Sequence, residues 1–447
     1  MDTRFSQRIV EILKLGFPIL VGQLGFIVVA FADNIMVGSY STPALASASF
    51  VNNIFNVVNF SCMGFALGFT PLVGTLFGAG NRRKIGALTR NALAVNVIFG
   101  ALLCCLMGLL YAALPHLGQP RELLPLIRPY YLLALASIAT TVVFGVFSQW
   151  CYGIRNTSTP MWIILITNAL NILGNWLLIY GHMGLPEMGL TGAGVSTLTA
   201  KIIGATAMAA YFFLHPDNKI YSRAFHKAPL AITDMRHITR TALPVSVQTS
   251  CEATSFSIGA LMAGWIGTIQ LAAFQIIVVV GTLGFTIYYS FGGAVAILVA
   301  NAAGNSDTLA QRRYASAGYT ILLSIMTLSC LTFILAGRHL MGIFTPDKAV
   351  IETATAMILP LVIYQLADAT QINYSSALRG TSHVMPMLWI AIVSYIIIGI
   401  PATYLLAFPT GWGLFGIILS FTVSLATAAL LFRYFFLRVT ANKKNAA

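Results

Sequence analysis

The chain has 447 residues, of which 58% are hydrophobic and only 8% are charged. Globular proteins carry roughly 25% charged residues, so this composition excludes an ordinary water-soluble domain. The net charge of +13 would suit a nucleic-acid partner, but the positions of the charges, described below, exclude that interpretation. The composition predicts an integral membrane protein.

Twelve long apolar segments follow one another along the chain. Each can cross a bilayer as a helix, which takes about 20 apolar residues. Helices also satisfy their own backbone polar groups in lipid, and we find no alternating pattern typical of membrane β-strands. In chain order the predicted spans are 14–38, 44–76, 87–114, 124–153, 159–181, 188–214, 238–264, 269–301, 310–336, 350–378, 384–407 and 412–436. The predicted fold class is therefore all-α, with twelve transmembrane helices.

The basic residues are distributed unevenly between the two ends of these spans. Of the 25 Lys and Arg, 20 lie at one side, four lie at the other, and Lys201 lies inside the sixth span. Membrane proteins concentrate Lys and Arg in their cytoplasmic loops. The pattern predicts a multi-pass protein with both termini in the cytoplasm, in contact with lipid and not with nucleic acid. The first apolar run is too long for a cleavable signal peptide, so we expect none.

An internal repeat relates the two halves of the sequence. Matching residues near the start of each half are 226 positions apart (244 − 18), and matching residues later in each half are 224 positions apart (379 − 155). The first set pairs Pro18, Val21, Met36, Gly38, Thr42, Leu45 and Ala46 with Pro244, Val247, Met262, Gly264, Thr268, Leu271 and Ala272. The later set includes Arg155 with Arg379, and Gly189, Leu190 and Gly192 with Gly413, Leu414 and Gly416.

The repeat contains six spans, an even number, so both halves should have the same orientation in the membrane. Such halves are related by a pseudo-twofold axis along the membrane normal, a plan used by secondary transporters. We predict a six-helix lobe over 1–214, a cytoplasmic connector over 215–236, and a second six-helix lobe over 237–447.

Three carboxylates, Asp33, Glu252 and Asp368, fall inside predicted spans. A charge at the bilayer centre costs about 2.5–3.5 kcal/mol even on insertion scales, so each of them needs a reason. A buried carboxyl can bind H⁺ or Na⁺ and release it when a cationic substrate competes. The alternative is a structural carboxylate that hydrogen-bonds neighbouring helices. We interpret all three as candidate ion-coupling residues.

Helical spacing places other polar residues beside these carboxylates. Tyr364, Gln371 and Ser375 share a face with Asp368, and Gln248 and Ser255 share one with Glu252. The ring of Tyr364 could face a cation.

The N-terminal half carries asparagine stripes instead. Asn171 and Asn175 line the fifth span, where Asn175 has about the same depth as Asp33. Such stripes also serve as packing contacts between helices. Tyr364, Gln371, Gln248, Asn171 and Asn175 are the candidate substrate- or cation-binding residues. Lys201 either pairs with Asp33 or reaches toward an interface.

Several motifs coincide with these residues. They are GQLGFIVVAFADNIMVG with Asp33, NIxxN at Asn171 and Asn175, PVSVQTSCE with Glu252, YQLAD from Tyr364 to Asp368, and ALRG from Ala377 to Gly380. Over nearly its full length the chain resembles the multidrug and toxic compound extrusion (MATE) family, and most closely its NorM-like bacterial branch.

The resemblance implies a V-shaped pair of six-helix bundles that alternates between outward- and inward-facing states in a bacterial inner membrane. It assigns Na⁺ or H⁺ coupling to Glu252 and Asp368, which would hold the metal if Na⁺ is used, with Tyr364 beside them. In related branches the residue matching Asp33 is the coupling site of the N-terminal lobe. Those branches often have Asp where this chain has Asn175.

We therefore expect an antiporter that exports cationic lipophilic molecules in exchange for Na⁺ or H⁺, as a monomer and without any other cofactor. The alternative is a lipid-linked oligosaccharide flippase of the same broad fold, which should carry cations in its cavity; only Lys201 qualifies. We do not expect an enzyme, because the sequence has neither HExxH nor GxSxG.

Overall fold

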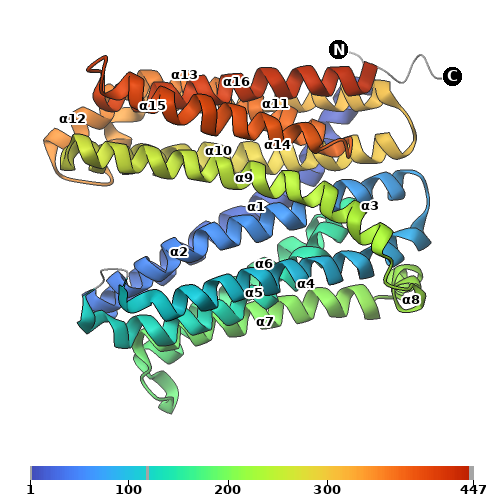
Figure 1. Ribbon diagram of the computed structural model, residues 1–447, viewed down its shortest axis with the longest axis horizontal. Coiled ribbons are helices and arrows are strands. Elements are labelled where there is room, and N and C mark those ends of the chain that lie inside the picture. Colours follow the sequence, from blue (N-terminus) through green and yellow to red (C-terminus); the bar gives the residue numbers. More distant parts are fainter. Residues whose placement is uncertain (1–2, 117–119, 442–447) are drawn as a thin grey trace. The chain divides into compact units, whose positions relative to one another are not determined.

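The computed structural model describes residues 3–116 and 120–441, and every regular element in these ranges is helical (Figure 1). The first half contains α1 (Thr3–Tyr40), α2 (Thr42–Leu67), α3 (Phe69–Gly78), α4 (Arg82–Ala113), α5 (Leu124–Gly153), α6 (Ser158–Tyr180), α7 (Gly189–Leu214) and α8 (Lys219–Lys227). The second contains α9 (Ile232–Ile266), α10 (Thr268–Gly304), α11 (Thr308–Gly342), α12 (Lys348–Ala356), α13 (Ile358–Gly380), α14 (Met385–Ala391), α15 (Ile400–Ala407) and α16 (Gly413–Ala441). The predicted all-α class is confirmed.

Each predicted span coincides with one long helix or with a helix that has a local break. Ten spans of the described residues are long and apolar enough to cross a membrane, and the bent pair of α12 and α13 makes an eleventh. The long helix α9 lies outside this apolar set because polar side chains, Glu252 among them, interrupt its hydrophobic run. This polar interruption is where the candidate site lies.

The break between α2 and α3 has two local causes. Pro71 in the first turn of α3 has no N–H to donate. Its ring also clashes with the backbone carbonyl four residues earlier, so the helix cannot continue unbroken. Gly68 lies at the break, and a Cβ there would be 2.4 Å from the Cα of Ala242. Only glycine lets these two backbones approach so closely.

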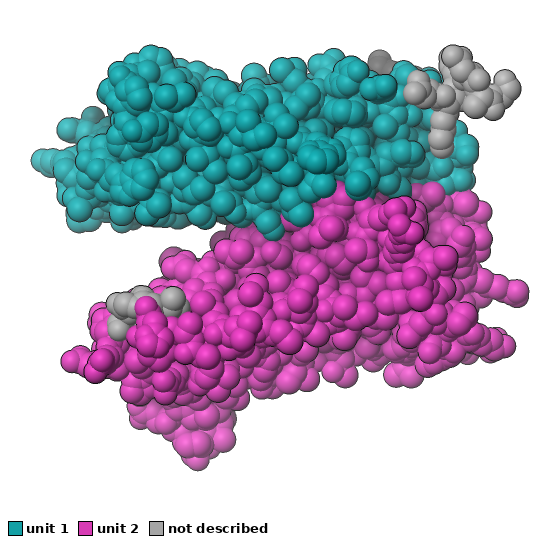
Figure 2. Space-filling view, viewed as in Figure 1, with its two compact units in different colours: residues 1–20, 247–447 teal, residues 21–246 magenta. Residues whose placement is uncertain are grey.

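The helices pack into two compact units, coloured separately in Figure 2. One unit contains residues 1–20 and 247–447, and the other contains residues 21–246. The boundaries follow Leu20 and Ser246, which are 226 residues apart (246 − 20), the same offset as in the sequence repeat. The packing boundaries thus fall inside α1 and α9, whereas the sequence-based boundaries fall in the connector.

Side-chain contacts explain this division. The start of α1 packs with the second half of the chain, where the Tyr314 hydroxyl donates to Glu11 Oε2 at 2.8 Å. A Cβ at Gly16 would lie 2.3 Å from the ring of Phe291. In the same way, the start of α9 packs with the first half, and Ser246 Oγ donates to a carbonyl of α2 at 3.0 Å. Equivalent segments of the two repeats are thus exchanged.

A glycine at matching positions in the two halves, Gly192 and Gly416, has a structural reason. A Cβ at Gly192 would lie 2.5 Å from the carbonyl oxygen of Leu178, and a Cβ at Gly416 would lie 2.0 Å from that of Leu406. In each half, therefore, the start of the last helix touches the backbone of the helix before it. The repeated glycine is required by this close contact.

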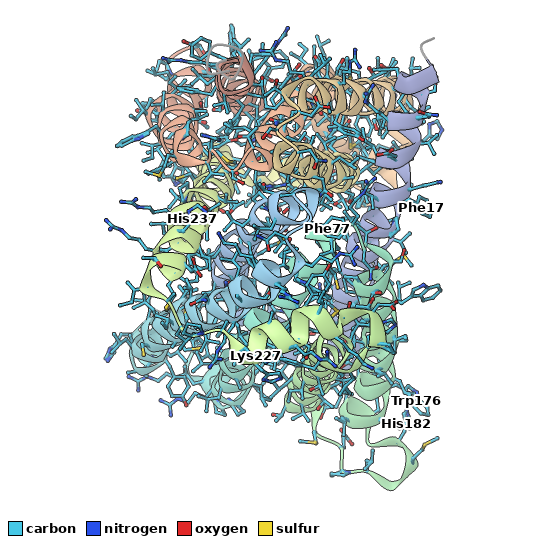
Figure 3. All side chains as sticks on the ribbon, turned by 90° about the vertical axis from the view of Figure 1, so that its right-hand side faces the viewer. Phe17, Phe77, Trp176, His182, Lys227 and His237 are labelled. Atoms are coloured by element: carbon cyan, nitrogen blue, oxygen red, sulfur yellow. The ribbon has the colours of Figure 1, made fainter. Side chains whose placement is uncertain are left out.

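The connector helix α8 is held against the first turns of α4. Arg90 Nη1 donates to the carbonyls of Phe225, His226 and Ala228 at 3.4, 3.1 and 2.6 Å, which satisfies groups at the C-terminus of α8. The side chain of Tyr221 is buried against Trp150, with ring centroids 5.4 Å apart. The basic side chains of α8 stay exposed, including Lys227 at its end (Figure 3).

Candidate functional site

The unit of residues 1–20 and 247–447 carries a polar cluster around Glu252. Gln248 lies one turn before Glu252 on α9, and its Nε2 donates to Glu252 Oε2 at 2.9 Å. Tyr395 is buried beside this pair, where its hydroxyl interacts electrostatically with Glu252. From α13, Gln371 Nε2 donates to that same hydroxyl at 2.8 Å. Gln248 thus holds Glu252, and Gln371 holds the tyrosine that lies beside them.

Asp368 lies on α13 and is only 1% exposed. Its Oδ2 has no hydrogen-bond partner among the described residues, and neither has Gln371 Oε1. The charge of Glu252 acts on Asp368 across the cluster. Buried oxygens without a hydrogen-bond partner are rare and call for an explanation. A bound ion would be one such explanation. Carboxylate and amide oxygens suit a proton or a hard cation such as Na⁺.

Tyr364 lies one turn before Asp368 and is also buried. Its ring meets the ring of Phe256 on α9 edge-on, with centroids 6.3 Å apart. On the next position of α13, Gln365 accepts a hydrogen bond from the Tyr288 hydroxyl at 2.7 Å. The aromatic pair forms an apolar wall beside the polar side chains of α9 and α13.

Sequence inspection missed Tyr395 as well as Gln365 and Tyr288. Tyr395 stands in the isoleucine-rich run of an apolar span, where its spacing suggested no polar stripe. It belongs to η5 (Ile392–Gly399), a π-helical segment between α14 and α15. The signal that could have found it is Pro401, because a proline inside a span disturbs the helical register before it.

The unit of residues 21–246 has its own carboxylate, Asp33 on α1. The amide of Asn175 on α6 donates to Asp33 Oδ1, in agreement with their predicted equal depth. With its amide oriented to suit its neighbours, Asn171 donates to the same oxygen at 3.0 Å and accepts from Thr197 Oγ1 of α7 at 3.1 Å. Asn171 and Asn175 are both buried. Two asparagines thus hold Asp33 through its Oδ1.

The position of α6 depends on how it ends. Its C-terminal residue is followed by Gly181 in the left-handed conformation, with φ of 69°. Glycine adopts this conformation without strain. The chain then turns back so that the ring of His182 lies against Trp176, with centroids 4.3 Å apart (Figure 3).

The structure decides where Lys201 reaches. Its Nζ donates to Ser137 Oγ at 3.1 Å and to Thr141 Oγ1 at 3.5 Å, both on α5. It does not bind Asp33, whose hydrogen bonds come from the two asparagines described above. Lys201 and Asp33 therefore have different hydrogen-bond partners within the same unit.

The second span contributes exposed amides. Asn52 and Asn56 on α2 are exposed in mid-span, and Asn52 Oδ1 accepts from the Tyr130 hydroxyl of α5 at 3.3 Å. Amides are too polar to face lipid, so this face of α2 must be accessible to water.

Comparisons with known proteins agree with the repeat and the fold. The family model MatE matches residues 18–177 and again 244–405, so its two matches begin 226 residues apart (244 − 18). The relative described as "Probable multidrug resistance protein NorM" of Rhizobium meliloti (strain 1021) is 27% identical over 435 residues, which cover 96% of this chain and 92% of the relative. The protein with the same description from Geobacillus kaustophilus (strain HTA426) is 29% identical over 426 residues, 94% of this chain and 92% of its own.

Solved structures share the fold at lower sequence identity. An outward-facing conformation of a multidrug resistance MATE family transporter of the MOP superfamily superposes with a TM-score of 0.88 at 18% identity, over 98% of this chain and 97% of that one. The eukaryotic MATE transporter AtDTX14 superposes with a TM-score of 0.86, also at 18% identity, over 98% of both chains. These likenesses establish the arrangement of the helices.

Proposed function

Because the chain belongs to the MatE family of multidrug and toxic compound extrusion transporters, we propose that it exports cationic, lipophilic molecules in exchange for Na⁺ or H⁺. It is a multi-pass membrane transporter and not an enzyme. We place it as a monomer in a bacterial inner membrane. We place both termini in the cytoplasm, because the basic residues concentrate at one side of the spans.

The pair of Glu252 and Asp368 is the observation that supports ion coupling. Both carboxylates lie inside predicted membrane spans, Asp368 is buried, and its Oδ2 has no protein partner among the described residues. A proton or Na⁺ at this pair would neutralise charge that is otherwise costly in the bilayer. A cationic substrate would offset the same charge, so ion and substrate compete for one site.

Competition at a shared charge accounts for exchange. Ion entry from outside displaces the bound cation there, and ion release to the cytoplasm lets the next cation bind. One elementary charge moving through 100 mV supplies about 2.3 kcal/mol, which corresponds to roughly fifty-fold accumulation. The Tyr364 and Phe256 rings would hold the apolar part of the substrate. Asp33, with Asn171 and Asn175, would serve as a second cation site.

The test is efflux of a cationic rhodamine ester from proteoliposomes, driven separately by a Na⁺ gradient and by a pH gradient. Efflux under one gradient identifies the coupling ion. Failure under both gradients would refute ion-coupled export of this substrate class.

Asp368→Asn and Glu252→Gln should each abolish gradient-driven efflux, because they remove the charge and keep the shape. Asp347→Asn is the matched control. Asp347 is exposed and caps α12 by accepting from Ala349 N at 2.8 Å, and asparagine caps a helix equally well. Normal efflux by Asp368→Asn, or an equal loss in the control, would contradict the assigned role.

A further inference from the structure

The connector between the two halves contains a short helix that lies across the direction of its neighbours. In Figure 1, α8 (Lys219–Lys227) is seen end-on, whereas α4, α5 and α7 run lengthwise, and Figure 3 shows α8 from the side. Because the long helices cross the bilayer, α8 runs along the membrane surface. A helix in this orientation can present one face to lipid headgroups.

The two faces of α8 differ in character. One face is turned toward its own unit, where Tyr221 and Ser222 are buried. The other face carries Lys219, Arg223 and Lys227, which are four residues apart and therefore share one side of the helix. All three side chains are exposed. Like charges at this spacing repel one another and destabilise a helix, so an anion close to this face would stabilise it.

A second group of cations lies at the start of α4. Arg82, Arg83 and Lys84 occupy its first turn and are exposed, and this turn contains no acidic residue. The N-terminus of a helix is the positive end of its dipole, where cations are unfavourable and anions are favourable. Three successive cations at this end are therefore the reverse of the usual arrangement, and an external anion would offset their repulsion.

The two groups of cations belong to one surface. A Cβ at Gly86 would lie 2.2 Å from the carbonyl oxygen of Tyr221, so the first turns of α4 touch the backbone of α8 directly. Further along α4, Arg90 fixes the C-terminal end of α8 through its three hydrogen bonds to carbonyls. We call the six exposed residues of this surface the basic corner; they are Arg82, Arg83, Lys84, Lys219, Arg223 and Lys227.

The chain places few acidic residues beside the basic corner. Residues 79–90 contain no Asp or Glu, and residues 215–227 contain only Asp217. The side chain of Asp217 is 90% exposed, and its Oδ2 lies 3.9 Å from Nδ1 of His215. One exposed carboxylate cannot neutralise six cations, so the surface stays strongly positive.

Exposed apolar side chains lie on either side of these cations. Leu214 ends α7 and Ile220 lies on α8, and they are 76% and 42% exposed. Leu230 and Ile232 follow α8 and are also exposed. Cations beside exposed apolar groups are typical of segments at a membrane interface, where the cations meet headgroups and the apolar groups reach the acyl chains. A soluble anion would leave these apolar groups in water.

We propose that the basic corner, together with the apolar side chains beside it, binds anionic phospholipids of the cytoplasmic leaflet. The phosphate groups meet the cations of α8 and of the first turn of α4, and the acyl chains cover Leu214 and Ile220. Each Lys or Arg near an anionic membrane surface strengthens binding by about fivefold. The proposal uses the cytoplasmic placement of the connector and is independent of the exported substrate.

The experiment compares the full chain in nanodiscs of phosphatidylcholine alone with the full chain in nanodiscs of equal amounts of phosphatidylcholine and phosphatidylglycerol. A lipid that binds the folded chain raises its thermal unfolding midpoint. The midpoint should be higher with phosphatidylglycerol, and this rise should shrink as the KCl concentration increases.

Two triple variants divide the basic corner between its two helices. Replacing Lys219, Arg223 and Lys227 together with Gln should leave less than about half of the rise, because half of the cations are removed. Replacing Arg82, Arg83 and Lys84 together with Gln should cause a similar loss. Each variant is compared with itself in the two kinds of nanodisc, so a change in its intrinsic stability does not affect the result.

The matched control replaces Arg236, Arg240 and Arg438 together with Gln. These arginines are exposed and belong to the same predicted side of the membrane, but they lie on α9 and α16. The control removes the same charge and should keep the full rise. An equal loss in the control would reveal a general charge effect and overturn the proposal.

Two other results would also overturn it. One is an unaltered protein with the same midpoint in both kinds of nanodisc. The other is an equal rise that potassium phosphate produces in phosphatidylcholine nanodiscs and that the α8 variant loses, because the surface would then bind a soluble anion. Neither result would affect dye efflux, so this proposal and the proposed export can fail separately.

Discussion

Gly86 offers a stringent test of how the connector helix is held. It lies in the first turns of α4, and a Cβ there would be 2.2 Å from the carbonyl oxygen of Tyr221 and 2.9 Å from the Cβ of Ala224. The nearest atom is backbone, which cannot rotate away as a flexible side chain would. Gly86→Ala must therefore push α8 away from α4.

Two opposing effects set the magnitude. Alanine favours a helix over glycine by about 1 kcal/mol, whereas overpacking of this kind costs about 1–3 kcal/mol and sometimes more. We expect α8 to be loosened by up to about 2 kcal/mol net. Gly108 in the same helix is the matched control, because a Cβ there would have no atom within 4 Å. Gly108→Ala retains only the helical gain.

The assay is limited trypsin cleavage within α8, whose Lys219, Arg223 and Lys227 are exposed. Cleavage requires local opening, and its rate follows the population of the open form. A loss of 1.4 kcal/mol corresponds to about tenfold faster cleavage. Gly86→Ala should be cut about tenfold faster than the unaltered protein, and Gly108→Ala no faster. Equal rates in the two variants would refute the packing argument.

Two further predictions concern packing within each unit. Gly416→Ala places a Cβ 2.0 Å from the carbonyl oxygen of Leu406, so thermal unfolding in detergent should report a loss of about 1–3 kcal/mol; an unchanged midpoint would contradict that contact. Lys201→Met should change stability by no more than about 1 kcal/mol and preserve dye efflux, because the hydroxyls of Ser137 and Thr141 still donate to backbone carbonyls. Loss of efflux with normal folding would instead place Lys201 in the transport path.

Several features of this protein were determined by its sequence. The spans could be located because the cost of moving a residue into lipid adds up along the chain and needs no knowledge of neighbours. Asp33, Glu252 and Asp368 were found for the same reason, since a charge in an apolar run is conspicuous wherever the helix packs. The repeat could be read from fixed offsets, and the family model matches the two halves at that offset.

Only the tertiary structure decided which groups meet. Lys201 binds hydroxyls on α5 and leaves Asp33 to two asparagines. The start of each half packs with the opposite half, and Tyr395, on a π turn, accepts a hydrogen bond from Gln371. These outcomes depend on the rotation and packing of each helix. Hydropathy is a property of single residues, whereas a hydrogen bond is a property of pairs brought together through space, so the sequence located the charges and the fold chose their partners.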